Sequence, residues 1–408
     1  MYKFIRRVSA AACTAVIALF GTIAYYDNIL PESYYVTENQ VLTFENQQEI
    51  QAKPKLSETR ATQASATVQS SEIVSLKLFG VIPIKDVKVM SIDRPLLIPG
   101  GTPFGIKMLT KGVVVIGLAD IDGKNGAISP SKEAGLKVGD IILSVDGEIV
   151  ESNQDIARVI EKTDGKTVDI VLQRAEREME LEISPVFSTA GQCYKAGIWV
   201  RDSSAGIGTV TYFDPATSAF GSLGHPVCDV DTGEILPLDT GEVVPVAIGD
   251  VIKAQSGVPG ELSGSFISES PIGMLMKNTQ TGLFGTLNFC PSAYDQIPMA
   301  LRQEVKIGPA TIYTTISGTS PCEYDILIEK IDLNDDTITK NIVIKVTDPK
   351  LLAATGGIVQ GMSGSPIIQN GKLIGAVTHV FVKDPTKGYG IFCENMYKYS
   401  KDIEIGAN

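Results

Sequence analysis

The stretch Gly356-Gly-Ile-Val-Gln-Gly-Met-Ser-Gly-Ser-Pro-Ile-Ile-Gln-Asn-Gly-Lys-Leu-Ile-Gly-Ala-Val-Thr378 decides the fold of the C-terminal half of the chain. Gly361 and Gly364 bracket Ser363, so the backbone can turn sharply and its N–H groups can converge. Asn370-Gly371, between apolar runs, is a strong short-range signal of a β-hairpin. A Gly/Ser turn alone is common, but this turn with its hairpin predicts a serine nucleophile held at the start of a strand.

The same stretch resembles the nucleophile region of trypsin-like serine proteases, in which Gly-x-Ser-Gly-x-Pro precedes a hairpin and a pocket-lining strand. The resemblance implies that the backbone N–H groups of Gly361 and Ser363 form an oxyanion hole, where one donor is worth about 2.7–4 kcal/mol. Residues 190–408 consist mainly of short β runs separated by Gly, Pro and Asp, and tandem six-stranded barrels fit their length. We therefore expect a mainly β chain that ends in a chymotrypsin-like double β-barrel serine peptidase domain.

Serine is a poor nucleophile unless a base takes its proton, and the chain contains only two histidines. His225 lies in Phe220-Gly-Ser-Leu-Gly-His-Pro-Val-Cys-Asp229, between a glycine and a proline at the predicted end of a strand. His379 lies on the strand that leaves the hairpin, where a side chain could contact substrate. We predict that His225 is the general base, against the alternative of a structural turn histidine. Cys228 is expected to be a buried structural cysteine rather than a thiol nucleophile.

A third group should orient the imidazole, because its loss costs on the order of 10⁴-fold in rate in trypsin-like enzymes. Asp348 continues the apolar face of a strand in which alternate residues from Ile342 to Val346 point the same way. A carboxylate on such a face needs a partner, so we predict that Asp348 is the acid. A simple turn aspartate before Pro349 is the alternative interpretation. The other candidates for the acid are Asp229, Asp231 and Asp250.

The composition excludes several classes of function. The 408 residues carry a formal net charge of −12, which argues against a nucleic-acid partner, because phosphate binding needs a basic surface. No His-Glu-x-x-His or Cys-x-x-Cys spacing occurs, so the sequence predicts neither a metal site nor a cofactor. The six cysteines are scattered and do not form the pattern of a disulfide scaffold.

The N-terminus carries a candidate membrane segment. Basic residues precede an apolar stretch, Val8 to Tyr26, that is nearly long enough to cross a bilayer core. Positive charge before the stretch and Asp27 after it place the N-terminus inside and the body outside. We predict an uncleaved signal-anchor helix over residues 1–26, with a cleaved signal peptide as the alternative. The polar composition of residues 27–72 predicts a flexible linker.

Residues 73–97 are predicted to be a β-rich connecting segment, and residues 98–187 resemble a PDZ domain. Phe104, Gly105 and Ile106 fit the loop whose backbone N–H groups capture the terminal carboxylate of a peptide. A small helix with its turn, a strand, a second helix and two alternating strands follow in the order that bacterial PDZ domains show.

With these parts in order, the chain resembles the SpoIVB peptidase family of endospore-forming bacteria. The phrases Phe-Gly-Ser-Leu-Gly-His225-Pro and Gly-Met-Ser363-Gly-Ser-Pro carry the resemblance. It implies a catalytic triad of Ser363, His225 and Asp348 in a serine endopeptidase that acts in signalling between the two compartments of a sporulating cell.

The resemblance also implies a place and partners. The protein would be anchored in the forespore membrane, facing the space between forespore and mother cell, and would cleave its own N-terminal region. It would then cleave a regulatory subunit of a membrane-embedded protease complex, so that a late sigma factor is processed. The alternatives are an HtrA-like extracytoplasmic quality-control protease, in which PDZ domains follow the protease, and a catalytically inactive PDZ scaffold.

Overall fold

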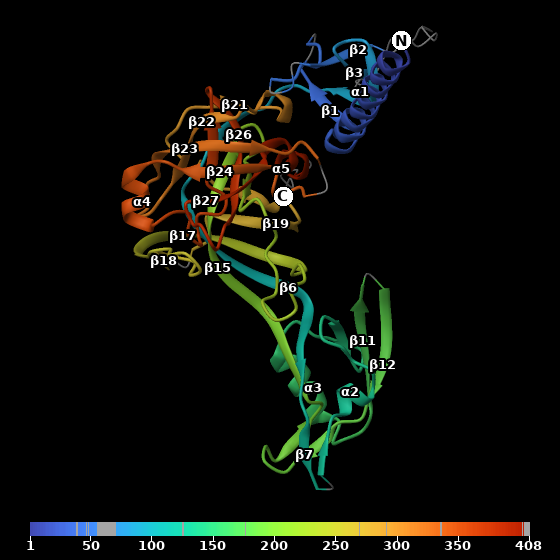
Figure 1. Ribbon diagram of the computed structural model, residues 1–408. Helices are drawn as coiled ribbons and strands as arrows, with labels where there is room; N and C mark the ends of the chain where they lie inside the picture. The colour runs from blue at the N-terminus through green and yellow to red at the C-terminus, as the bar shows by residue number, and fades with distance from the viewer. Residues whose placement is uncertain are drawn as a thin grey trace, which may run out of the picture.

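The computed structural model describes residues 1–37, 40–45, 47, 49–54, 71–124, 126–175, 177–268, 270–290, 292–334, 337–401 and 403. An N-terminal helix and a small sheet lie at one end of the molecule, a double-barrel body lies in the middle, and a further domain lies at the other end (Figure 1). Strands outnumber helices among the described elements, as the sequence predicts.

The N-terminal helix α1 spans Tyr2–Ile29 and has no buried residue. Its 28 residues are long and apolar enough to cross a membrane by length and composition. The helix ends three residues beyond the predicted boundary at residue 26.

A four-stranded sheet follows the helix. Two of its strands lie where the sequence predicts a flexible linker over residues 27–72, and the other two lie mainly in the predicted β-rich segment over residues 73–97. The strand order in the sheet is β1-β4-β3-β2, with the bounds β1 (Ser33–Val36), β2 (Ile50–Pro54), β3 (Ser71–Leu78) and β4 (Ile82–Ser91). The linker prediction is wrong for the described part, because its few apolar residues are buried against the second barrel. These residues include Tyr34, Leu42, Phe44 and Ile50. The Ser- and Thr-rich residues 55–70 lie outside the described residues. We refer to this sheet as the cap sheet.

The first barrel is a closed ring of six strands in the order β6-β17-β19-β20-β16-β15, completed by pairing between β6 and β15. Its strands are β6 (Pro103–Leu118), β15 (Ile198–Asp214), β16 (Ala219–Ser222), β17 (Leu238–Ile252), β19 (Gly273–Thr279) and β20 (Gly282–Leu287). The strand β18 (Glu261–Phe266) forms a hairpin with β17, and β5 (Leu96–Pro99) pairs with β15 and β21 (Ile297–Pro298). Buried Phe104, Phe220 and Val243 belong to the core of this barrel.

The second barrel closes in the order β22-β23-β24-β27-β26-β25. Its strands are β22 (Gly308–Thr314), β23 (Cys322–Ile331), β24 (Ile342–Val346), β25 (Pro366–Gln369), β26 (Lys372–Val380) and β27 (Lys387–Phe392). Between β25 and β26, Asn370 and Gly371 have φ values of 51° and 71°, the left-handed pair that a two-residue type I′ turn requires. The predicted hairpin and double barrel are therefore confirmed. The helices α4 (Pro349–Thr355) and α5 (Cys393–Ser400) complete the domain.

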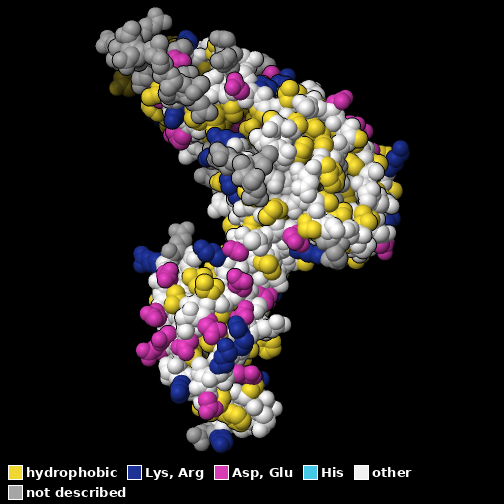
Figure 2. Space-filling view, turned by 180° about the vertical axis from the view of Figure 1, so that it is seen from behind, with side chains coloured by type: hydrophobic (Ala, Val, Ile, Leu, Met, Phe, Trp, Pro, Cys, Tyr) yellow, Lys and Arg dark blue, Asp and Glu magenta, His cyan; other side chains and the backbone are white. Residues whose placement is uncertain are grey.

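The domain at the far end is inserted between two strands of the first barrel, β6 and β15. It contains β7 (Ile121–Gly123), β8 (Gly126–Ile128), α2 (Pro130–Glu133), β9 (Ile141–Val145), β10 (Glu148–Ile149), α3 (Asn153–Lys162), β11 (Val168–Arg174), β12 (Arg177–Ile183), β13 (Val186–Ser188) and β14 (Cys193–Lys195). It has its own hydrophobic core, in which Ile142, Ile156 and Ile170 are buried. Figure 2 shows acidic and basic side chains gathered on its surface. The sequence predicts a PDZ domain over residues 98–187 and a peptidase domain that begins only at residue 190. This division is wrong, because the first half of β6, which precedes the inserted domain, is a strand of the peptidase barrel.

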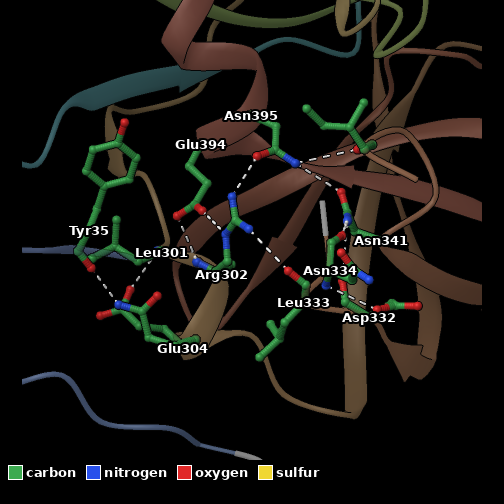
Figure 3. A network of polar contacts seen from close by, with 12 residues as sticks. Tyr35, Leu301, Arg302, Glu304, Asp332, Leu333, Asn334, Asn341, Glu394 and Asn395 are labelled. Carbon is green, nitrogen blue, oxygen red and sulfur yellow. Dashed lines mark hydrogen bonds and ion pairs between the residues drawn. The ribbon is translucent and has the colours of Figure 1, made fainter. Parts of the chain in front are cut away.

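A buried polar network joins the second barrel to the short 3-10 helix η1 (Arg302–Glu304) that precedes it (Figure 3). The Arg302 guanidinium pairs with the Glu394 carboxylate and donates to Asn395 Oδ1 at 2.9 Å. Gln303 next to it donates to the backbone carbonyl of Tyr35 in the cap sheet at 2.7 Å. Loss of one partner from such a buried ion pair costs about 3–5 kcal/mol, so the pair holds η1 firmly to α5. The hydrogen bond from Gln303 and the apolar core that the cap sheet shares with the second barrel then join the cap sheet to the peptidase body.

Candidate active site

Ser363 lies on a tight turn between α4 and β25. Gly361 and Gly364 on either side of it have φ values of +97° and +96°, which L residues with side chains rarely adopt. A Cβ atom at Gly364 would also collide with the backbone of Thr209 and Leu223. Both glycines that the sequence singles out are therefore required by the turn.

The turn leaves two backbone N–H groups free. The N–H of Met362 donates to Val359 O at 3.1 Å, and that of Gly364 donates to Val377 O at 2.8 Å. Across the described part of the chain, the N–H groups of Gly361 and Ser363 have no acceptor. These are the two donors that the sequence predicts for an oxyanion hole, and both are available to a ligand.

Two threonines of β15 hold the turn from the first barrel. Thr209 Oγ1 donates to Gly361 O at 2.8 Å, and Thr211 Oγ1 donates to Gly364 O at 2.8 Å. The backbone N–H of Thr209 also donates to Ser363 O at 3.2 Å. Sequence reasoning missed these residues, although polar side chains at alternate positions of an apolar strand are a weak signal that they face a common partner.

His225 follows β16 on a turn in which Leu223 and Gly224 both have positive φ, at 64° and 71°. A Cβ atom on Gly224 would lie 2.8 Å from the side chains of Ile391 and Thr378 in the second barrel. The missing side chain therefore lets the histidine turn approach the strand that lies beside the Ser363 turn.

The imidazole of His225 is held in one tautomer. Its Nδ1 lies 2.9 Å from the carbonyl oxygen of Pro226, and because a carbonyl can only accept, Nδ1 carries the proton. Nε2 is then the free acceptor, as a general base requires. Burial lowers the pKa of His225, and the hydrogen bond to Pro226 offsets only part of this, so the ring is neutral at pH 7.

Ser363 and His225 line the same cavity, which has a volume of about 220 Å³. The junction of the two barrels thus brings the predicted nucleophile and the predicted base together. Most of the lining is apolar and includes Ile106 and Met108 of β6, and Cys228 lines the cavity too. Burial raises the pKa of the Cys228 thiol, so it stays protonated and is not a nucleophile.

The Ser363 hydroxyl is bonded away from the base. Ser363 Oγ donates to the carbonyl oxygen of Thr378 at 2.8 Å, and no described hydrogen bond joins it to His225. Rotation of the side chain must break this bond before the proton can pass to the imidazole. The structure therefore represents a resting arrangement of the two groups.

His379 lies next to His225, with 5.0 Å between the ring centroids and 40° between the ring planes. Burial, together with the charges of His225 and Lys340, lowers the pKa of His379 to about 4. Its Nδ1 is buried without a hydrogen-bond partner among the described residues. The sequence suggests only a substrate contact for this residue, whereas the structure places its ring, tilted, beside that of the candidate base.

The structure does not bring Asp348 to the imidazole. Its carboxylate caps α4, accepting the N–H groups of Lys350 and Leu351 at 2.8 and 3.0 Å. Desolvation alone would raise the pKa of Asp348, but the backbone donors of Leu351 and Lys350 outweigh it and the pKa is lowered. The predicted pairing with His225 is absent here because the side chain turns toward the helix N-terminus instead.

The other candidate acids have partners of their own. Asp229 accepts the N–H groups of Asp231 and Thr232, and its second oxygen lies 3.0 Å from Arg201 Nε. Asp231 pairs with Arg201 as well, and Asp250 accepts the N–H of Val251. Among the described residues, no carboxylate bonds to either imidazole.

The predicted carboxylate-binding loop at Phe104, Gly105 and Ile106 is wrong. These residues lie inside β6, which pairs with β15 on one side and with β17 on the other. Phe104 is 1% exposed and Ile106 is 4% exposed. Their backbone is part of the closed barrel, so its N–H groups are not free to hold a peptide terminus.

The edge that β6 gives to the sheet of the inserted domain is already paired with the chain's own strand β15. PDZ domains take peptides as an added strand at a sheet edge. Here the outer half of β6 pairs antiparallel with Ile198–Arg201 of β15, and α3 contacts both β14 and β15. A peptide that adds to this edge has to displace β15, which also lines the cavity and holds the Ser363 turn.

Comparison with known proteins gives two family matches. A model described as SpoIVB peptidase S55 matches residues 192–397, half of the chain, and a PDZ domain model matches residues 127–174. The second match confirms the PDZ prediction for the inserted domain.

Among curated proteins, serine protease HTRA1 from Xenopus tropicalis is 39% identical over 57 residues, which cover 14% of this chain and 12% of that protein. HTRA1 from Xenopus laevis is 35% identical over the same length. Among solved structures, the PDZ domain of the SdrC-like protein from Listeria monocytogenes matches 22% of this chain and 87% of its own, with 23% identity and a TM-score of 0.18. The Rv3671c protease in its inactive form matches 49% of this chain and 85% of its own, with 15% identity and a TM-score of 0.30.

Proposed function

Because the chain belongs to the SpoIVB peptidase S55 family and is therefore a serine peptidase, we propose that it cleaves proteins by attack of the Ser363 hydroxyl on a peptide carbonyl, with His225 as the base. The observation that supports this assignment is the shared cavity onto which both side chains open. The neutral imidazole with its Nε2 free is the form that can take the serine proton.

The reaction begins when Ser363 Oγ leaves the carbonyl of Thr378 and turns toward His225. As Oγ bonds to the peptide carbon, Nε2 takes the hydroxyl proton, and the new oxyanion accepts the N–H groups of Gly361 and Ser363. The protonated imidazole then gives its proton to the leaving amine as the C–N bond breaks. Water attacks the acyl group by the same steps and restores the hydroxyl.

In this mechanism the carbonyl of Pro226 orients the imidazole in the resting form. A role for Asp348 as the third catalytic group stays a prediction, and it requires the carboxylate to leave its cap on α4.

We further propose that α1 anchors the peptidase in the forespore membrane, facing the space between forespore and mother cell. Basic Lys3, Arg6 and Arg7 before the apolar segment and Asp27 near its end support this orientation. There the enzyme cleaves its own N-terminal region within residues 27–72 and then a regulatory subunit of a membrane-embedded protease complex, which permits processing of a late sigma factor. An HtrA-type quality-control role is less favoured, because the PDZ domain here is inserted into the first barrel rather than placed after the peptidase.

The full chain in lipid vesicles tests the catalytic assignment through its self-cleavage. We expect Ser363→Ala to abolish the appearance of the shortened product. Ser365→Ala is a matched control in the same motif, because the Ser365 hydroxyl is buried without a partner in the described structure, and it should cleave like the wild type. Self-cleavage by the Ser363→Ala protein would refute the proposal.

A further inference from the structure

The turn between β3 and β4 of the cap sheet carries an aromatic residue that the turn itself disfavours. Val81 N donates to Leu78 O at 3.1 Å, and the residues between them, Phe79 and Gly80, have φ values of +50° and +72°. This is a type I′ turn, whose first central position prefers Asn or Asp, and a bulky residue there is a conformational outlier. Phe79 is 68% exposed and Val81 is 76% exposed. Packing within the fold therefore does not explain the phenylalanine.

The turn is fixed beside the end of α1. Glu49 joins the two, because its carbonyl accepts the N–H of Phe79 at 2.6 Å and its carboxylate accepts the hydroxyl of Tyr26 in the last turn of the helix. Lys85, in the strand that follows the turn, donates to two backbone carbonyls at the end of α1 at 3.0 and 2.7 Å. These bonds tie the turn to the last turn of α1, where the helix leaves its apolar segment.

The neighbouring side chains are those that a bilayer interface attracts. Tyr25 and Tyr26 contact each other edge to face at 5.4 Å, and Tyr25 is 60% exposed. Tyrosine is enriched at the membrane–water interface, where its ring is buried and its hydroxyl stays wet. Lys53 donates to Gly80 O at 2.7 Å, and a lysine with its apolar stem along the turn can keep its charge among lipid headgroups.

From this geometry we propose that the turn Phe79-Gly80-Val81 inserts into the bilayer interface beside α1. The inference rests on the proposed anchoring of α1. The cap sheet then contacts the lipid at a second point, and the Gln303–Tyr35 hydrogen bond and the core shared with the second barrel hold the cap sheet to the peptidase body. The active-site cavity is thereby held at a set height and orientation above the membrane.

The chain contains a single tryptophan, Trp199, so fluorescence can test the proposal with the full chain in vesicles. The variant Trp199→Phe with Phe79→Trp carries its only tryptophan at the turn. We expect its emission to shift to the blue and to be quenched by lipids brominated near the headgroup more than by lipids brominated deep in the acyl chain. The wild type is the control. Its Trp199 is 64% exposed and pairs with Gly117 where β6 enters the inserted domain, and that domain lies at the opposite end of the molecule from α1 (Figure 1), so Trp199 should not be quenched.

Extraction with alkaline carbonate separates this inference from the anchoring on which it rests. A protein that stays with the vesicles while the tryptophan at position 79 is unquenched overturns the inference and leaves the anchor intact. Release of the protein by carbonate overturns both.

The variant Phe79→Asn tests whether the Phe79 ring stabilises the fold of the cap sheet itself. It creates an Asn-Gly turn, so we expect a midpoint of thermal unfolding equal to or above that of the wild type. A lower midpoint would assign the ring a structural role inside the cap sheet and would count against its role at the membrane.

Discussion

The rings of His225 and His379 lie in contact, tilted by 40°, at the junction of the barrels, although only one of them is needed as a base. The neutral state of both rings follows from burial, which lowers both pKa values. The sequence was enough to select Ser363 and His225, because glycines and a proline around each residue predict rigid turns at strand ends. It was not enough to place His379, since the distance between two rings on different barrels depends on how the barrels pack.

The acid limb of the pH profile reports the protonation of His225. Because burial lowers the pKa of His225 below its usual 6.5, kcat/KM should hold as the pH falls to about 6.5 and decline only below it. A decline that begins above pH 7 would contradict a buried, neutral base.

The free energy of unfolding has to be measured over the same pH range as kcat/KM, because it also depends on pH. His379 binds its proton near pH 6.5 in the unfolded chain but only near pH 4 in the folded one, so the free energy of unfolding falls as the pH drops through this window. Intrinsic fluorescence at each pH separates loss of activity from loss of fold, and His379→Gln should reduce the pH dependence of stability.

Two substitutions of Asp348 distinguish its role as the N-cap of α4 from a role in catalysis. Asp348→Ala should lower the free energy of unfolding by about 0.5–2 kcal/mol, whereas Asp348→Asn should leave it nearly unchanged, because Asn caps helices as well as Asp does. Urea denaturation measures both values, and an unchanged Asp348→Ala protein would refute the capping role. A fall in kcat of Asp348→Asn at unchanged stability would show that the carboxylate reaches His225 in an active conformation.

At the scale of elements, local signals predicted local structure. The hairpin between β25 and β26 follows from Asn370-Gly371, and the helices and strands of the inserted domain follow from their periodicity. The strand β6 was misread as a carboxylate-binding loop, because its glycine suggests a loop while its two pairing partners lie far along the chain. Pairing between distant strands overrides such local signals.

The turn that carries His225 depends on the absence of a side chain at Gly224. Gly224→Ala adds left-handed strain of about 1–2 kcal/mol and a collision with Thr378 and Ile391 that costs about 1–3 kcal/mol more, and it should abolish self-cleavage. Gly233→Ala is the matched control: its φ is +73°, but a Cβ atom there meets nothing within 4 Å, so only the strain applies. Thermal unfolding and self-cleavage of both variants check this, and equal effects would contradict the close approach.

At the scale of the whole molecule, the sequence predicted the kinds of domain but not their connectivity. The order of motifs suggested a PDZ domain that precedes the peptidase, yet the first barrel begins before the PDZ domain and is completed after it. The cap sheet was foreseen only in part. The β-rich prediction for residues 73–97 covers β4 and most of β3, whereas β1 and β2 lie in the stretch predicted as a linker. The apolar residues of that stretch are few, and they become informative only once the second barrel supplies the surface that buries them.

The two ends of the inserted PDZ domain lie side by side, so we expect that the domain can be deleted and the barrel strands β6 and β15 joined directly. Ala119 N donates to Gly197 O at 2.8 Å, so a replacement of residues 120–196 by Asn-Gly would join β6 to β15 through a two-residue hairpin. We expect the shortened chain to be soluble and to unfold in a cooperative thermal transition. A chain without such a transition would show that the barrel cannot close without the PDZ domain.

Labelling with a fluorophosphonate, a reagent that bonds to activated serine hydroxyls, tests the central claim most directly when mass spectrometry locates the adduct on the full chain. The account predicts one adduct, on Ser363, that disappears in the His225→Ala protein. An adduct on another residue, or equal labelling of Ser363 without the imidazole, would contradict it.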